Sequence, residues 1–236
     1  MTAPGRAAGA VLPGGTMGAM TAAEEFRPES ERITRTLRDQ IIDGTRAPGS
    51  RLVEREIAAE LDVSRLPVRD ALRDLVNEGL VTPRPRTWAV VREFTASDIA
   101  DLVEVRSALE ILAFRLAAQR RTRAGLAKLR SVLDAERAAA ERGDGAEARR
   151  SAADFHETVT ELADNALLTE LEGTLRSRMR WLLGQHDEFA VVADEHEELF
   201  RAIEARDVER VEELALHHLE TSQSKATEHR RRLAAE

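Results

Sequence analysis

Hydrophobic residues in the N-terminal part of the chain repeat every three or four positions, which is the period of an amphipathic helix. The pattern predicts a first helix that begins at Pro28 and ends near Gly44. It also predicts two shorter helices, over residues 54–61 and 64–79, which are joined by a short link. Two helices so closely joined are typical of a helix-turn-helix unit.

Two short extended runs follow, over residues 80–82 and 88–92, and they predict a two-stranded hairpin. The helical period returns at Thr95, which is predicted to form an N-terminal capping pair with Asp98. The rest of the chain predicts six long helices, over residues 96–121, 123–142, 145–163, 166–188, 191–205 and 207–232.

These elements predict a mainly α fold, with an N-terminal winged helix-turn-helix at residues 27–94 and an all-α six-helix bundle at residues 95–236. Residues 1–26 are expected to form a disordered leader. Its apolar run is interrupted by Gly and Pro, so it is too short for a secretory signal or a membrane span. We therefore expect a cytoplasmic protein that makes no contact with a membrane.

Composition and charge limit the chemistry that the chain can perform. Its 236 residues include no Cys, which excludes a disulfide framework, a cysteine-ligated metal and a cysteine nucleophile. The net charge of −8 argues against a protein that coats DNA regardless of sequence, because such binding needs basic surface. Basic and acidic side chains nearly balance in residues 27–94, so the negative charge lies in the helical part.

One predicted helix carries a row of arginines on the face opposite its apolar stripe. Arg65, Arg69 and Arg73 follow each other at intervals of four after Ser64, so the three guanidinium groups leave from one side. In a major groove such groups donate two hydrogen bonds to guanine or bind phosphates, and Ser64 could bind a phosphate at the helix start. The alternative is a solvated face whose arginines are neutralised by neighbouring aspartates.

The predicted hairpin favours the DNA-binding alternative. Arg84 and Arg86 lie at its tip, and a basic hairpin after a helix-turn-helix can act as a wing that reaches the minor groove or the backbone. Two basic features thus share one small unit.

Three runs in this unit resemble the winged helix-turn-helix of GntR-family transcriptional regulators. They are PGSRLVEREIA at residues 48–58, VSRLPVRDAL at 63–72 and EGLV at 78–81. Trp88 stands where the family usually has a glycine at the wing tip, so the resemblance assigns no contact to the wing. It implies contacts with operator DNA for the residues at four matching positions, which are Arg55, Ser64, Arg65 and Arg69.

Three histidines lie on otherwise apolar faces of three different predicted helices. His156, His196 and His218 are each expected to point inward, and neutral imidazoles that meet inside a bundle can bind a divalent metal. The alternative is that each is a core histidine satisfied by a neighbour.

Arg106 and Glu110 lie four residues apart on the core side of the first bundle helix. A buried ion pair is one interpretation. The other is a pocket for a small effector, in which the planar guanidinium of Arg106 pairs with a ligand carboxylate.

The bundle also resembles the helical effector-binding (FCD) domain of the FadR-type branch, in the runs VRSALE at residues 105–110, DFH at 154–156 and DNALL at 164–168, and around His196 and His218. The resemblance implies a metal such as zinc or nickel, bound by one Asp and three His. The three histidines match, but Ala152 stands at the Asp position. Asp154 is about 200° around the helix from His156 and is a poor substitute. Water or the effector would complete the site.

We therefore predict a homodimeric regulator that binds double-stranded operator DNA and responds to a small carboxylic acid, with repression as the implied sign of control. Two alternatives stay open. The bundle could be a metal-dependent enzyme that uses the three histidines with Glu157, Glu195 or Glu197 as a base. The chain could also be a structural DNA-associated protein without an effector, which would have a bundle core without a cavity.

Overall fold

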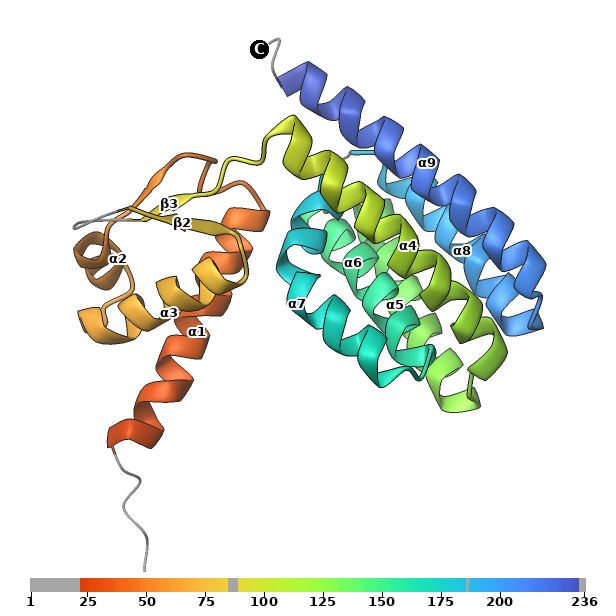
Figure 1. Cartoon of the computed structure of the whole chain (residues 1–236), viewed down its shortest axis with the longest axis horizontal. Helices are drawn as coiled ribbons and strands as arrows, with labels where there is room; N and C mark the ends of the chain where they lie inside the picture. Colours follow the sequence, from red (N-terminus) through yellow and green to blue (C-terminus); the bar gives the residue numbers. More distant parts are fainter. Residues whose placement is uncertain (1–21, 85–88, 186, 234–236) are drawn as a thin grey trace, which may run out of the picture.

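The structure is a computed structural model, and it describes residues 22–84, 89–185 and 187–233. An N-terminal domain with a small sheet is followed by a larger helical domain (Figure 1). The elements in chain order are α1 (Ala22–Ile42), β1 (Arg51–Leu52), α2 (Glu54–Glu60), α3 (Arg65–Asn77), β2 (Val81–Pro83), β3 (Ala89–Val91), α4 (Ala96–Arg120), α5 (Arg123–Arg142), α6 (Gly145–Leu162), α7 (Ala166–Leu183), α8 (Phe189–Ala205) and α9 (Val208–Leu233).

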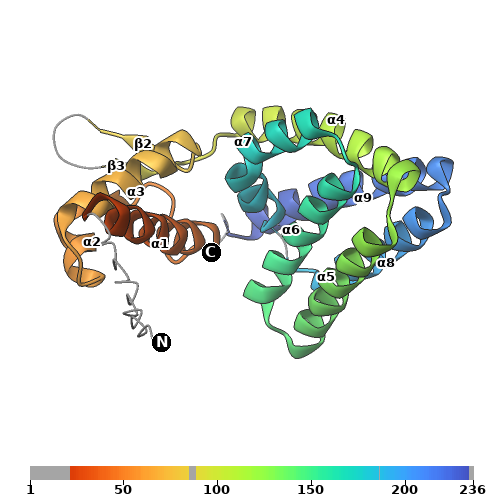
Figure 2. The same cartoon turned by 90° about the horizontal axis from the view of Figure 1, so that it is seen from below.

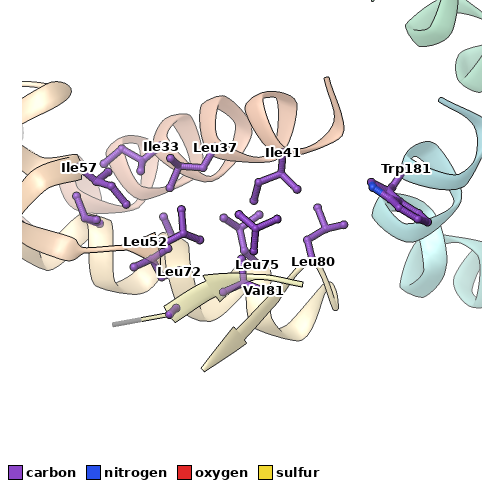
Figure 3. Packing of buried hydrophobic residues seen from close by; sticks show 14 of the residues in the cluster. Ile33, Leu37, Ile41, Leu52, Ile57, Leu72, Leu75, Leu80, Val81 and Trp181 are labelled. Atoms are coloured by element: carbon purple, nitrogen blue, oxygen red, sulfur yellow. The ribbon is translucent and has the colours of Figure 1, made fainter. Parts of the chain in front are cut away.

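The N-terminal domain packs three helices against a three-stranded antiparallel sheet in the order β1-β3-β2. The predicted hairpin is confirmed, with Val81 opposite Val91. The strand β1, which the sequence pattern did not predict, pairs Leu52 with Ala89. Two residues are too few to show a period. Leu37 of α1 and Leu75 of α3 are fully buried in the core between these elements (Figure 3).

The predicted start of the first helix was wrong. Helix α1 begins at Ala22, so Pro28 lies inside it and not in its first turn. The prediction placed the proline in the first turn because only there is its missing N–H not needed. The chain before it is rich in Ala and Glu, which favour a helix and extend α1 toward the N-terminus. Residues 1–21 lie outside the described residues, so a disordered leader stays a prediction.

The helical domain is a bundle of α4 to α9, which confirms the mainly α fold predicted from the sequence. Thr95 and Asp98 form the predicted capping box at the start of α4. Helix α7 ends at Leu183, before the predicted residue 188, and Gly184 takes the C-cap position. Helices α5 and α6 pack together along one side of the bundle, and α4 packs against α9 (Figure 2). Phe114, Phe155 and other apolar side chains fill the core.

Helix α7 contributes to both domains. Its Trp181 and Leu182 belong to the hydrophobic core of the N-terminal domain, and Figure 3 shows Trp181 extending from the bundle toward that core. The Trp181 ring stacks on Phe94 with ring centroids 4.1 Å apart. One turn earlier, the hydroxyl of Ser177 donates a hydrogen bond of 2.7 Å to Glu78, directly after α3. The two domains are therefore joined by packing as well as by the chain.

Candidate functional site

The predicted arginines converge on one groove of the N-terminal domain. The buried stripe of α3 includes Val68 and Leu75, and its opposite face exposes the arginines. Ser64 is the N-cap residue, as predicted, although its side chain makes no capping hydrogen bond. Arg86 and Trp88 lie outside the described residues. The groove between α2, α3 and the hairpin, here called the arginine groove, is lined by five of the predicted residues, Arg55, Arg65, Arg69, Arg73 and Arg84.

Glu54 is a residue of this groove that the sequence analysis did not single out as functional. Its carboxylate accepts two hydrogen bonds of 3.0 Å from Arg69, through Nε and Nη2, and one of 3.3 Å from Arg65. The hydrogen bonds from Arg69 are the main reason why the pKa of Glu54 is lowered. The Nη1 edge of the Arg69 guanidinium points away from this pair, and both arginines are about half exposed or more.

The three predicted histidines meet inside the bundle. His156 of α6, His196 of α8 and His218 of α9 are buried, and one ring nitrogen of each lies within 4.8 Å of those of the others. We call this group the imidazole cluster. The rings of His156 and His218 are stacked, with centroids 5.3 Å apart, and the ring of His196 meets that of His156 edge-on at 5.0 Å.

Two carboxylates fix the outer side of the cluster. His196 Nδ1 lies 2.8 Å from Glu136 Oε2, and His218 Nδ1 lies 2.6 Å from Glu195 Oε2. The Nε2 atoms of both rings are buried without a hydrogen-bond partner, and so are both ring nitrogens of His156. The sequence analysis missed Glu136, because it lies on a different helix from every histidine of the cluster.

Burial disfavours the charged form of two of these rings, those of His156 and His218. It is the first cause that lowers the pKa of His156 well below its usual value, followed by His196 and Arg106. Burial also lowers the pKa of His218 to about 3, although the hydrogen bond with Glu195 acts in the opposite direction. Neutral imidazoles with inward lone pairs and no protein partner are suitable ligands for zinc or nickel. The residues present therefore fit a divalent metal ion.

The helix α6 offers no carboxylate to this cluster. Ala152 is buried beside it, whereas Asp154 is half exposed and forms an ion pair with Arg180 of α7. Of the Asp and the His that the resemblance places on this helix, only His156 is present.

A cavity of about 70 Å³ opens next to His156, with room for roughly five water molecules or a small organic acid. Its wall is partly apolar, and we call it the polar cavity after the charged residues that line it, such as Arg106 and Glu172. Arg106 Nε donates to Glu110 Oε1 at 2.8 Å, and Arg106 Nη1 donates to Ser222 at 3.0 Å. Glu110 Oε1 is also 3.3 Å from His156 Nδ1, without the geometry of a hydrogen bond. Arg106 Nη2 and Glu110 Oε2 are buried and have no partner, so both predicted effector residues retain hydrogen-bonding capacity.

The far wall of this cavity is formed by α7, through Glu172, Arg176, Arg180 and neighbouring residues. Burial, and then the charge of Glu110, raise the pKa of Glu172 to about 7. Near neutral pH this carboxyl can hold a proton and donate a hydrogen bond to an acid.

The three glutamates considered as a catalytic base each form a hydrogen bond with a neighbouring side chain. Glu157 accepts from Arg180 at 2.6 Å, Glu195 binds His218, and Glu197 accepts from Arg130 at 2.7 Å. Their negative charges are therefore matched by neighbours.

Comparison with known families identifies both halves of the chain. The family of bacterial regulatory proteins named gntR matches residues 29–91, and the FCD domain family matches residues 101–221, which is half of the chain. The chain belongs to the GntR family. In this GntR-family protein the arginine groove lies in the gntR domain, and the imidazole cluster and the polar cavity lie in the FCD domain.

The relatives of this GntR-family protein are regulators of transcription. It is 32% identical over 202 residues to a probable D-xylose utilization operon transcriptional repressor of Paenarthrobacter nicotinovorans, a match that covers 80% of this chain and 89% of the repressor. It is 29% identical over 198 residues to the HTH-type transcriptional repressor RspR of Escherichia coli K12, covering 82% and 87%. A Rhodococcus sp. RHA1 structure described as a transcriptional regulator GntR superposes with a TM-score of 0.72 at 27% identity, covering 85% of this chain and 98% of that one.

These findings make the protein a DNA-binding transcriptional regulator and give no support to the enzyme alternative. Among the described residues, no helix is both long and apolar enough to cross a membrane.

Proposed function

We propose that this protein is a homodimeric, cytoplasmic repressor whose affinity for operator DNA is controlled by a small carboxylic acid bound beside a divalent metal in the FCD domain. One observation carries the proposal. The polar cavity is lined both by His156 of the imidazole cluster and by Arg106, whose Nη2 is buried without a partner. A carboxylate would satisfy that donor. The names of the two relatives, both of them repressors, support repression as the sign of control.

The imidazole cluster would hold the metal, with zinc and nickel as the candidates. When bound, the metal supplies an open coordination position that water or a ligand oxygen can occupy. Arg106 and a protonated Glu172 would then orient the acid by donating hydrogen bonds to it. A structural DNA-associated protein without an effector has no use for such a cavity.

A ligand in this cavity can act on the DNA-binding domain through α7. The helix lines the cavity with Arg176 and Arg180, and it binds the N-terminal domain with Trp181 and with the Ser177–Glu78 hydrogen bond. Displacement of α7 by a ligand therefore changes contacts at the end of α3, which carries the arginines.

Ser177→Ala tests this coupling between the cavity and the DNA-binding domain. We expect zinc, alone or with acetate, lactate, malate or gluconate, to change the operator affinity of the wild type by roughly 5–150-fold, the usual range of coupling between sites. In the variant this change in operator affinity should be about fivefold smaller, because one hydrogen bond of about 1 kcal/mol is lost. Thr174→Ala, on the same helix, is the control. If no probe alters operator affinity in the wild type, the proposed regulation by a ligand is wrong.

The dimer is proposed to form through the outer faces of α4 and α9. Leu112 and Leu216 are 42% and 46% exposed, and each lies one turn from the ion pair between Arg115 and Glu212 that joins these helices. The two leucines therefore share one exposed face, and Val105 extends it by two turns along α4. A palindromic operator needs two recognition helices, so a second copy of the chain is the partner that this apolar face fits.

Leu112→Glu is expected to dissociate the dimer, because a charge at a central interface position costs about 2 kcal/mol or more. Sedimentation equilibrium at micromolar concentration measures this. Leu167→Glu on α7, where the leucine is 64% exposed, is the control and should stay dimeric. A monomeric wild type, or dissociation by the control alone, would contradict the proposed face.

A further inference from the structure

The buried charges around the imidazole cluster do not balance. Arg106 pairs with Glu110 at 2.8 Å, and Lys225 pairs with Glu195 at 3.0 Å, so each of these carboxylates has a cation. Glu136 is only 1% exposed, and no Lys or Arg of the described part of the chain forms an ion pair with it. A buried carboxylate without a cation is costly. Some other positive charge is therefore expected beside Glu136 in the working protein.

The hydrogen bond with Glu136 orients the neighbouring histidine. Glu136 Oε2 is 2.8 Å from His196 Nδ1, which leaves Nε2 of that ring as the atom available to a metal. Nε2 is buried without a hydrogen-bond partner, and the rings of His156 and His218 lie close to that of His196, with centroids 5.0 and 4.8 Å away. Glu136 therefore turns the Nε2 atom of His196 into the cluster.

We propose that Glu136 is the positioning residue of the metal centre. It holds His196 in the ligating tautomer, and its charge is balanced by the cation that the three imidazoles bind. This inference rests on the metal site proposed above. It assigns a role in metal binding to α5, a helix that carries none of the three histidines.

This role predicts that Glu136→Gln lowers the affinity for zinc but does not lower the stability of the metal-free protein. Glu136→Gln keeps an oxygen that can accept from His196 but removes the charge. The metal-free variant should be as stable as the wild type or more stable, because an unbalanced buried charge is gone. Its affinity for zinc should fall by roughly 10–100-fold, the usual effect of losing an outer partner of a metal ligand.

Glu195→Gln is the matched control. Glu195 holds His218 as Glu136 holds His196, but its charge is already balanced by Lys225. Removing it leaves a lysine that is 12% exposed without its closest carboxylate, so the metal-free control should be less stable than the wild type. The two variants therefore resemble each other in their weaker metal affinity and differ in the sign of their effect on stability.

The experiment combines zinc titration against a competing chelator with thermal unfolding in excess EDTA, for the wild type, both Gln variants and Glu136→Met. The Met variant removes the charge and the hydrogen bond together, and so covers the case in which the buried amide of Gln disturbs folding. The proposal is supported if at least one of the two Glu136 variants binds zinc more weakly and keeps the metal-free stability of the wild type. Unchanged zinc affinity in both overturns it while the metal site stands, and so does lower metal-free stability in both. A wild type that does not bind zinc or nickel removes the metal site itself.

Discussion

Arg69→Ala is expected to weaken binding to operator DNA by roughly 5–150-fold, because one arginine that contacts a base edge through two donors contributes about 1–3 kcal/mol of discrimination. The fold should not change, since Arg69 lies outside the buried stripe of α3 and is 46% exposed. Fluorescence anisotropy with the DNA upstream of the gene and with scrambled DNA, at two fixed salt concentrations, measures the effect. Salt must be fixed because backbone affinity alone can imitate a site.

Arg201→Ala is the matched control for this variant. Arg201 is 69% exposed on the bundle and pairs with Glu197, so the control loses the same charge far from the arginine groove. An equal loss of affinity for operator and scrambled DNA in Arg69→Ala would show that the side chain binds phosphate and does not read bases. An unfolded variant would show that the assignment of faces on α3 is wrong.

Zinc is expected to stabilise the wild type strongly and His196→Ala not at all. At a free zinc concentration a thousandfold above the dissociation constant, binding to the folded state adds about 4 kcal/mol of stability. For a chain of this size that raises Tm by roughly 8–16 °C. The variant loses one of three ligands and also leaves Glu136 without its partner, so the shift should disappear. Calorimetry with zinc and with EDTA measures both.

His217→Ala is the control for unspecific zinc binding. His217 is exposed on α9, directly beside His218, and belongs to no cluster of the described residues that could hold a metal. It should keep the full shift in Tm. An equal zinc response in His196→Ala and the wild type would remove the three-histidine site.

The sequence predicted those features that depend on spacing within one helix. The row of arginines on α3, the inward face of each histidine and the capping pair at Thr95 follow from the period of 3.6 residues, and the structure places them accordingly. That the three histidines would meet followed from the bundle and from the family resemblance, since their spacing along the chain carries no such information.

The features that the sequence did not predict are contacts between elements. Glu54 meets Arg69 across 15 residues, and Glu136 meets His196 across 60. A single glutamate on a charged helix gives no signal of its partner, because most such residues are solvated. That Glu136 has no Lys or Arg partner among the described residues follows only from the positions of the side chains around it.

The shared helix α7 has a consequence for how the molecule unfolds. Trp181 and Leu182 complete a core that otherwise consists mainly of residues before Phe94. A fragment that ends after the hairpin would expose the apolar surface that these two side chains cover, and the bundle alone would expose a tryptophan that is 9% exposed in the intact chain. The two families divide the chain in sequence, but the two domains are not expected to unfold independently. Melting of the bundle should therefore lower the stability of the winged helix-turn-helix as well.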